Sequence, residues 1–271
     1  MTPAAFVDPK SNLGKALADC RAGASAIYVW PMLAWQEIRL RYRRSLLGPF
    51  WITISTAVML GVIGPLYGKL FQADLATYLP HLAVGFVLWL LFSGLINEGC
   101  QTFISARGLI TQTRIPLTVH VLRTVTRNFI IFAHHAMVVA VVLAFYPPAP
   151  TWSLLLVPAG IALIAANGFW AGLLVGMFCA RFRDIPPTVE SLVQVAFFLT
   201  PVLWQPQLLG RHQWAVEWNP LHHFLEIVRA PLMGMPASSL SWLVALAITL
   251  TGFGVTLLLF ARYRARIAYW V

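Results

Sequence analysis

Six stretches of the sequence are free of Asp, Glu, Lys and Arg and are long enough to cross a lipid bilayer as helices. A hydrocarbon core of about 30 Å requires about 20 helical residues. Composition agrees, because 59% of the 271 residues are apolar and 10% are charged, whereas soluble domains average roughly 45–50% and about 25%. We therefore expect a multi-span membrane protein with spans at residues 50–68, 75–97, 128–146, 152–180, 191–210 and 240–261.

The predicted fold class is an all-α integral membrane bundle. None of the six stretches shows the alternation of polar and apolar residues typical of a membrane β-barrel, so helices must satisfy the backbone hydrogen bonds in lipid. Four prolines between residues 205 and 239 predict short re-entrant external helices between spans five and six. We expect one transmembrane domain over 1–271, made of a cytoplasmic N-terminal segment 1–30, an amphipathic interface helix 31–48, the six-span bundle 50–261 and a cytoplasmic tail 262–271.

The positions of the basic residues predict the orientation in the membrane, because Lys and Arg favour cytoplasmic loops. With both termini inside, 16 of the 19 Lys and Arg residues are cytoplasmic, and only Lys69, Arg211 and Arg229 lie outside. The net charge of +10 is then mainly a topology signal rather than a sign of nucleic-acid binding. We expect a multi-pass protein of the bacterial inner membrane.

Residues 31–48 are predicted to form a helix at the cytoplasmic interface, since Trp35, Ile38, Tyr42 and Leu46 recur at helical spacing on one face. Two interpretations stay open: an anchor that orients the first span, or a platform for a cytosolic partner. The arginines of this helix, which include Arg39 and Arg43, can contact the phosphate of a lipid carrier or ordinary anionic lipids.

The loop at residues 101–115 combines apolar with basic residues, and this favours a short cytoplasmic helix over a solvated connector. Pro116 fits the first turn of the next helix. Elsewhere, Gly168, Gly172 and Gly176 recur every four residues and predict a close contact between two membrane helices.

Several motifs resemble the polysaccharide-export permeases of type-2 ABC transporters, the family of the O-antigen, capsule and teichoic-acid exporters. The run Glu37-Ile-Arg-Leu-Arg-Tyr-Arg-Arg-Ser-Leu-Leu-Gly-Pro-Phe-Trp51 looks like the family's interface helix and its turn into the first span. Three shorter matches are Arg181-Phe-Arg-Asp-Ile185, Thr200-Pro-Val202, and Asn219-Pro-Leu221 with Arg229.

The resemblance implies a homodimer seated on two copies of a separately encoded cytosolic ABC ATPase, with a channel between the two permeases for a lipid-linked polysaccharide, O-antigen being the favoured class. ATP and Mg²⁺ would be bound by the ATPase, and no cofactor by this chain. The residues expected to couple to the ATPase are Glu37, Arg41, Arg44, Arg107 and Arg114. Those expected in an external gate between spans five and six are Trp218, Leu221, Phe224 and Leu225.

The side chains themselves indicate a transport subunit rather than an enzyme. No catalytic constellation is recognisable, and Gly68-Lys69 fails the phosphate-binding pattern because Ile63 and Leu70 occupy its first glycine and hydroxyl positions. The adjacent His222 and His223 point to different helix faces and make a poor metal pair, so we expect no metal site.

Aromatic residues are the best candidates for a polysaccharide channel, because flat rings stack on sugar faces. Lipid packing explains any single one of them equally well. The candidate channel residues are Trp51, Trp89, Phe92, Phe197, Phe198 and Trp204.

Three alternatives remain. A drug or lipid exporter of the same fold would share the energy source, and only the substrate separates it. A proton-coupled secondary transporter is supported by His134 and His135 alone, for which neutral, hydrogen-bonded imidazoles are the favoured interpretation. A membrane glycosyltransferase would need acidic metal-binding residues, and Asp184 has no acidic neighbour.

Overall fold

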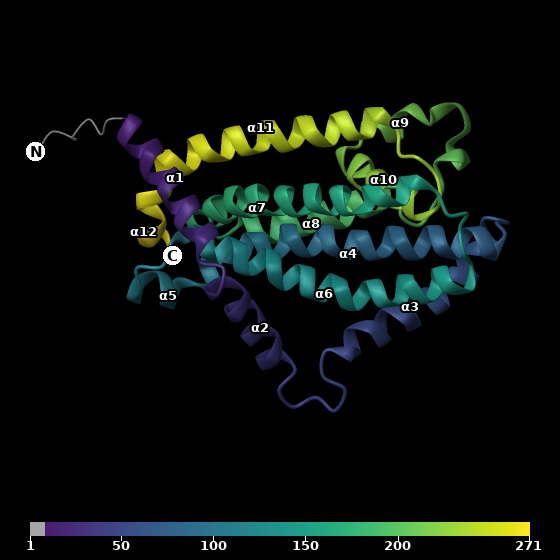
Figure 1. The fold of residues 1–271 in the computed structure, drawn as a ribbon, viewed down its shortest axis with the longest axis horizontal. Helices are drawn as coiled ribbons and strands as arrows, with labels where there is room; N and C mark the ends of the chain where they lie inside the picture. Colours follow the sequence, from purple (N-terminus) through teal and green to yellow (C-terminus); the bar gives the residue numbers. More distant parts are fainter. Residues whose placement is uncertain (1–8) are drawn as a thin grey trace, which may run out of the picture.

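A computed structural model describes residues 9–271, and this part of the chain folds into helices without a single β-strand (Figure 1). The fold class is therefore confirmed as all-α. In chain order the elements are α1 (Pro9–Ser25), α2 (Val29–Arg41), α3 (Phe50–Leu70), α4 (Leu75–Ser105), α5 (Arg107–Gln112), α6 (Leu117–Phe145), the 3₁₀ turn η1 (Trp152–Leu156), α7 (Val157–Arg181), α8 (Ile185–Leu199), η2 (Pro206–His212), α9 (Trp214–Glu217), α10 (Pro220–Leu232), α11 (Ser239–Tyr263), η3 (Arg264–Arg266) and α12 (Ile267–Trp270).

Five helical segments are long and apolar enough to cross a membrane. They contain α3, α4, α6, α7 and α11, and they coincide with the predicted spans one to four and six. Helix α6 starts at Leu117, directly after Pro116, which confirms the predicted helix start at this proline, and it continues through the predicted span at 128–146 as far as Phe145. The short helix predicted within residues 101–115 is α5.

The stretch predicted as the fifth span, 191–210, is not one helix. Helix α8 starts earlier, at Ile185, and ends at Leu199, where Thr200 adopts an extended backbone before Pro201. At 1.5 Å per residue, its 15 residues span about 22 Å, less than the hydrocarbon thickness of about 30 Å. The chain then runs through η2 and α9 into α10, which confirms that the proline-rich external segment consists of short helices.

The N-terminal part differs from the prediction in two ways. The interface helix is confined to α2, which ends at Arg41, and the chain turns before Gly48, whose φ of +56° is a conformation that glycine adopts without strain. The segment 1–30 was predicted only as a cytoplasmic N-terminal segment, without an assigned element, and in the structure α1 occupies Pro9–Ser25 and packs on α6 and α11.

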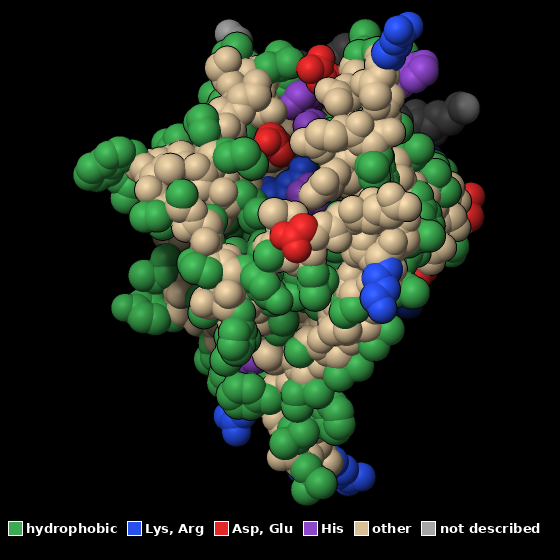
Figure 2. Space-filling view, turned by 90° about the vertical axis from the view of Figure 1, so that its right-hand side faces the viewer, with side chains coloured by type: hydrophobic (Ala, Val, Ile, Leu, Met, Phe, Trp, Pro, Cys, Tyr) green, Lys and Arg blue, Asp and Glu red, His purple; other side chains and the backbone are tan. Residues whose placement is uncertain are grey.

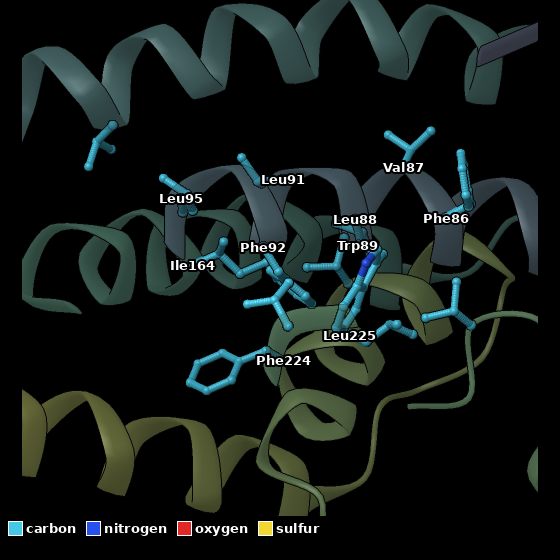
Figure 3. Packing of buried hydrophobic residues seen from close by; sticks show 14 of the residues in the cluster. Phe86, Val87, Leu88, Trp89, Leu91, Phe92, Leu95, Ile164, Phe224 and Leu225 are labelled. Atoms are coloured by element: carbon cyan, nitrogen blue, oxygen red, sulfur yellow. The ribbon is translucent and has the colours of Figure 1, made fainter. Parts of the chain in front are cut away.

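Helix α4 forms the centre of the bundle, where it contacts α3, α6, α7 and α8. Its apolar side chains are buried over most of its length, and Figure 3 shows Trp89 and Phe92 on the side of α4 that faces α10, with Val87 and Leu91 on the opposite side. The predicted glycine contact is confirmed, because a Cβ on Gly99 of α4 would lie 3.1 Å from the Cα of Gly172 on α7. Gly176 is similarly close to the carbonyl oxygen of Gly99.

The two ends of the bundle differ. Helices α1, α5 and α12 gather at one end together with the C-terminus, while α9 and α10 lie toward the other (Figure 1). We call these the α1/α12 end and the α9/α10 end. The positive-inside pattern predicts that the α1/α12 end faces the cytoplasm, and this orientation stays a prediction.

Candidate functional site

An ion cluster joins α2 to the membrane bundle near the α1/α12 end. The carboxylate of Glu37 on α2 pairs with Arg123, at 3.0 Å, and with Arg127, both on α6. Arg127 also pairs with Glu98 of α4 at 2.7 Å, and the Asn128 amide donates a 2.6 Å hydrogen bond to the same carboxylate. The pairing of Glu98 with an arginine agrees with its position at the end of the second span.

Burial makes these contacts stronger than ordinary surface ion pairs. Only 4% of the Arg123 side chain and 13% of the Arg127 side chain are exposed. A buried cation needs a carboxylate partner, since solvent cannot stabilise its charge there. Glu37 therefore has a structural reason to stay against α6, and α2 is fixed to α4 and α6 by charge as well as by apolar packing.

The residues predicted to couple to an ATPase divide into two groups. Glu37 lies inside the ion cluster rather than on a free surface, and half-exposed Arg41 reaches the rim of the cluster, 3.6 Å from Glu98. Arg44, Arg107 and Arg114 are exposed, the first in the turn after α2 and the other two in and after α5. The cluster thus connects the exposed coupling candidates of α2 with the two longest bundle helices.

Arg39 and Arg43, predicted to meet a lipid phosphate, are both exposed. Arg39 lies in the last turn of α2, and Arg43 follows its C-cap. Neither forms an ion pair with another side chain of residues 9–271. Their guanidinium groups are accordingly open to a phosphate, and lipid contact for these two residues stays a prediction.

At the α9/α10 end, helix α10 starts as the sequence indicates. Asn219 caps it by accepting a 3.0 Å hydrogen bond from the backbone N–H of Leu221, and Pro220 occupies the first turn. The Asn219 amide also donates to the Thr200 hydroxyl at 2.9 Å. One side chain therefore ties the start of α10 to the residue that ends α8.

Arg229 holds the broken backbone after α8 in place. Its guanidinium donates to the carbonyl oxygen of Pro201 at 2.7 Å, pairs with Glu226 at 3.3 Å and lies 3.2 Å from His81 Nε2 of α4. Arg229 is only 4% exposed. Figure 2 views this end of the molecule and shows histidine, basic and acidic side chains gathered in a hollow.

Helix α10 is amphipathic, and the four predicted gate residues occupy different environments. Phe224 and Leu225 are buried among the core side chains (Figure 3), and Leu221 is partly buried. Trp218, which precedes the N-cap, is 81% exposed. Helix α10 is thus packed on the bundle through Phe224 and Leu225 and presents Trp218 outward.

The predicted channel residues do not form one surface within a single subunit. Trp89 and Phe92 of α4 are buried in the core, with the ring centroid of Trp89 5.4 Å from that of Phe197 on α8. Trp51 on α3 and Phe198 on α8 are half or more exposed.

A groove of about 470 Å³ brings three of the aromatic residues together. Phe198, Trp204 and Trp218 line it, beside the end of α8 and the start of α10. The Trp204 indole N–H is fixed by a 3.0 Å hydrogen bond to the carbonyl oxygen of Phe198. Of the predicted aromatic residues, those around the end of α8 are therefore the ones best placed on an accessible surface.

The histidine pair in α6 is hydrogen-bonded, as favoured from the sequence. His134 Nδ1 lies 2.8 Å from the Ile130 carbonyl oxygen, and His135 Nδ1 lies 2.6 Å from the Thr56 hydroxyl of α3. At the other end, His223 is bonded to Ser241 and to the Glu217 carbonyl. Within residues 9–271 no three His, Cys, Asp or Glu side chains are placed to hold a metal ion.

A second anchor at the α1/α12 end was missed from the sequence. Asp19 of α1 accepts hydrogen bonds from the backbone N–H groups of Leu117 and Thr118, where α6 begins, and pairs with Arg264 at 2.9 Å. It caps a helix far away in the chain and joins it to the segment after α11. In the sequence, Asp19 is only one acidic residue in a segment of mixed charge. Its partner Thr118 is too far along the chain for any local spacing to have predicted the contact.

The fold and the two anchored ends define a polytopic membrane protein without a recognisable catalytic centre among the described residues, as in the membrane subunit of a transporter. Residues 28–233 match the family described as ABC-2 type transporter, and the chain belongs to this family. The motifs that suggested the family are thereby confirmed. The permease is the membrane component of such a transporter.

Two characterised relatives are similar to this chain. The O-antigen export system permease protein RfbA of Myxococcus xanthus is 26% identical over 172 residues, which cover 64% of this chain and 66% of the relative, just under two thirds of its length. The polysialic acid transport protein KpsM of Escherichia coli is 22% identical over 212 residues, which cover 73% and 78%.

Proposed function

We propose that the chain is the permease subunit of an ATP-driven exporter that moves a lipid-linked polysaccharide, with O-antigen as the favoured class, across the bacterial inner membrane. Two copies would form the channel, and two copies of a cytosolic ATPase would bind at the α1/α12 end. Membership of the ABC-2 family, together with two relatives named for O-antigen and polysialic acid export, carries this proposal.

The ion cluster supports an energy-coupling role for α2. A force applied to the exposed face of α2 by an ATPase would reach α6 through Glu37 and α4 through Arg127. Both helices extend across the bundle. Rigid, mutually paired elements transmit displacement better than a solvated loop.

The end of α8 supports an external gate. Helix α8 is too short to span the hydrocarbon alone, and the chain beyond it is tied to α10 by the contacts of Asn219 and Arg229 with Thr200 and Pro201. It is tied to α4 by the hydrogen bond from the Tyr78 hydroxyl to the Leu203 carbonyl. A movement of α10 would therefore alter the exit beside Phe198 and Trp204. These side chains face the accessible groove in which sugar rings could stack.

The decisive experiment deletes the chain in its native bacterium and measures surface polysaccharide together with cytoplasmic lipid-linked polymer. We expect the surface polymer to be lost and the lipid-linked polymer to accumulate, and a plasmid copy of the chain should restore both. Unchanged surface polymer with altered drug or lipid efflux would instead favour the drug or lipid exporter.

The energy source is tested separately. Purified alone, the chain should hydrolyse no ATP, whereas co-expression with its ATPase should give a stable complex that does. The matched control carries a lysine replacement in the phosphate-binding loop of that ATPase and should assemble without hydrolysis. Export that persists with this inactive ATPase and stops when the proton gradient is collapsed would favour the secondary transporter.

The gate is tested with the double variant Thr200→Cys and Asn219→Cys, since the two side chains already lie 2.9 Å apart. Oxidation should join α8 to α10 and block export, and reduction should restore it. Each single variant shows the effect of losing the Thr200–Asn219 hydrogen bond alone, and oxidation should change export only in the double variant. Full export by completely crosslinked protein would show that this segment does not gate the path.

A further inference from the structure

A pocket of about 290 Å³ lies where α7 and α11 end and the C-terminal α12 folds back against α7. It belongs neither to the ion cluster nor to the α9/α10 end. Met177, Phe178 and Leu259 give it an apolar wall, and Arg181 and Trp270 contribute polar atoms. The pocket therefore combines a surface for hydrocarbon with a guanidinium group at the end of two membrane helices.

Aromatic contacts hold Arg181 in position. Its guanidinium carbon lies 5.1 Å from the centroid of the Phe182 ring and 5.4 Å from that of the Trp270 ring. Such contacts involve the flat face of the guanidinium and leave the N–H groups at its edge available to a ligand. The Arg183 guanidinium lies beside it and donates to the Trp270 carbonyl oxygen at 3.4 Å.

The charge around the pocket is not neutralised by the protein. Arg262 and Arg266 lie on the ring of Tyr263, which also lines the pocket, at 5.8 Å and 5.9 Å. No ion pair with a carboxylate of residues 9–271 is formed by any of the four arginines, Arg181, Arg183, Arg262 and Arg266. By contrast, nearby Arg264 is paired with Asp19. Of these arginines, Arg181 lines the pocket itself. The other three contact the lining residues Tyr263 and Trp270, and none of the four has a carboxylate partner among residues 9–271.

We infer that this pocket binds the phosphodiester headgroup of an anionic phospholipid. Guanidinium groups bind phosphate through paired hydrogen bonds, and the first acyl carbons would lie against Met177, Phe178 and Leu259. A zwitterionic lipid would bring its own cation into the cluster of arginines. Basic pockets between membrane helices are a recognised arrangement for anionic lipid headgroups. An arginine at a helix end is common in itself, but the aromatic clamp and the apolar wall give this one a built site.

The first experiment compares lipids on the purified full-length chain in detergent by native mass spectrometry, with phosphatidylglycerol and phosphatidylethanolamine in equal amounts. We expect phosphatidylglycerol to remain bound preferentially. The double variant Arg181→Gln and Arg183→Gln should lower its binding at least about tenfold, because the loss of one charged hydrogen bond, that of Arg181, is already worth about a factor of ten. Excess inorganic phosphate should not displace the lipid, since it lacks the acyl chain.

The matched control, Arg44→Gln with Arg114→Gln, removes the same charge from exposed positions outside the pocket lining. It should bind phosphatidylglycerol as the unmodified chain does. An equal loss in both double variants would reduce the effect to general attraction by positive charge and would overturn the site.

The second experiment identifies the occupant in native membranes by placing the photo-crosslinker p-benzoylphenylalanine at half-exposed Phe178. An adduct with the mass of an anionic phospholipid supports the inference. An adduct with a polyprenyl phosphate would assign the pocket to the lipid carrier, and a protein adduct or none would exclude a lipid site. Because this readout requires no export, it is independent of the proposed function.

Discussion

At the scale of single residues, the described part of the molecule is organised by buried charges that join segments distant in sequence. Glu37 meets Arg123 and Arg127, Asp19 meets Arg264, and Arg229 reaches a carbonyl left free by the end of α8. Each contact gives a partner to a charge or backbone group in an apolar environment. Without that partner, burying the group would cost several kcal/mol.

We predict that Glu37→Gln destabilises the protein, because Arg123, 4% exposed, would lose its carboxylate. Breaking a buried pair costs about 3–5 kcal/mol, and since Glu37 is 30% exposed we expect about 2 kcal/mol, or roughly a 5 °C lower midpoint of thermal unfolding in detergent. The control Arg41→Gln removes a half-exposed partner 3.6 Å from Glu98 and should change the midpoint little. Equal midpoints for both variants would contradict the structural role of the cluster.

We also predict that Arg41→Glu with Arg44→Glu lowers export while the protein still inserts and folds. Both side chains are exposed on or just after α2, so reversing their charge should weaken contact with the ATPase rather than the bundle. The measurements are surface polysaccharide and the amount of ATPase that co-purifies. Normal values of both would leave these residues as topology determinants only.

At the scale of elements, the contact between α4 and α7 depends on the absence of side chains at three positions. Gly99 faces Gly172, and Gly176 faces the backbone of Gly99, so the neighbours that a Cβ would meet are largely main-chain atoms that cannot move aside. Small residues let membrane helices approach closely enough for dispersion contacts to hold them together, since lipid supplies no hydrophobic drive between helices.

We predict that Gly99→Val separates α4 from α7 and costs about 1–3 kcal/mol, the usual range for overpacking. The control is Gly61→Ala on α3, where an added Cβ meets no atom within 4 Å and where alanine favours the helix. Thermal unfolding in detergent measures both. Equal midpoints of thermal unfolding for Gly99→Val and the unmodified chain would show that separating α4 from α7 does not destabilise the protein.

Periodicity and composition were sufficient to predict the helices that follow from burial in lipid. They were not sufficient to predict the helices that depend on contacts with residues far away in the sequence. Five long spans, the start of α10 and the glycine contact follow from local spacing. Helix α1 was missed because it is fixed by a distant partner: Asp19 accepts a hydrogen bond from the backbone N–H of Thr118 at the start of α6. The end of α8 was placed too late, although Pro201 marks it, because the apolar run continues beyond that proline.

The candidate site was predictable in kind but not in arrangement. The spacing in α2 put Glu37 with the arginines of its polar surface, whereas in the structure it pairs with Arg123 and Arg127, on a helix far along the chain. The stacking of flat rings on sugars likewise suggested Trp89 and Phe92 as channel residues. Both are buried in the core of the chain, and their channel role stays a prediction. A sequence pattern reports which face is apolar, and tertiary packing decides what that face contacts.

At the scale of the whole molecule, the basic residues and the two dissimilar ends support one orientation. The α1/α12 end carries the arginines of α2, α5 and the C-terminal segments, whereas the α9/α10 end carries few. Because positive segments stay on the cytoplasmic side, the proline-rich segment with α10 would face outward, as an exit gate requires.

We predict that a membrane-impermeant maleimide labels Ala149→Cys in intact cells and does not label Arg183→Cys. Both positions are exposed on the protein, so the membrane alone decides access. Permeabilised cells should label both, which controls for reactivity, and the unmodified chain gives the background of its own three cysteines. Labelling of position 183 from outside would reverse the orientation.

Within residues 9–271, helix α3 packs mainly on α4 and α6 and leaves Trp51, Val58, Val62 and Leu66 half or more exposed. In water such a face would force aggregation, but acyl chains solvate it as well as another protein does. For the proposed channel of two copies, this means that each subunit would complete its own fold and diffuse in the bilayer before pairing. Shape, rather than escape from water, would then select the partner.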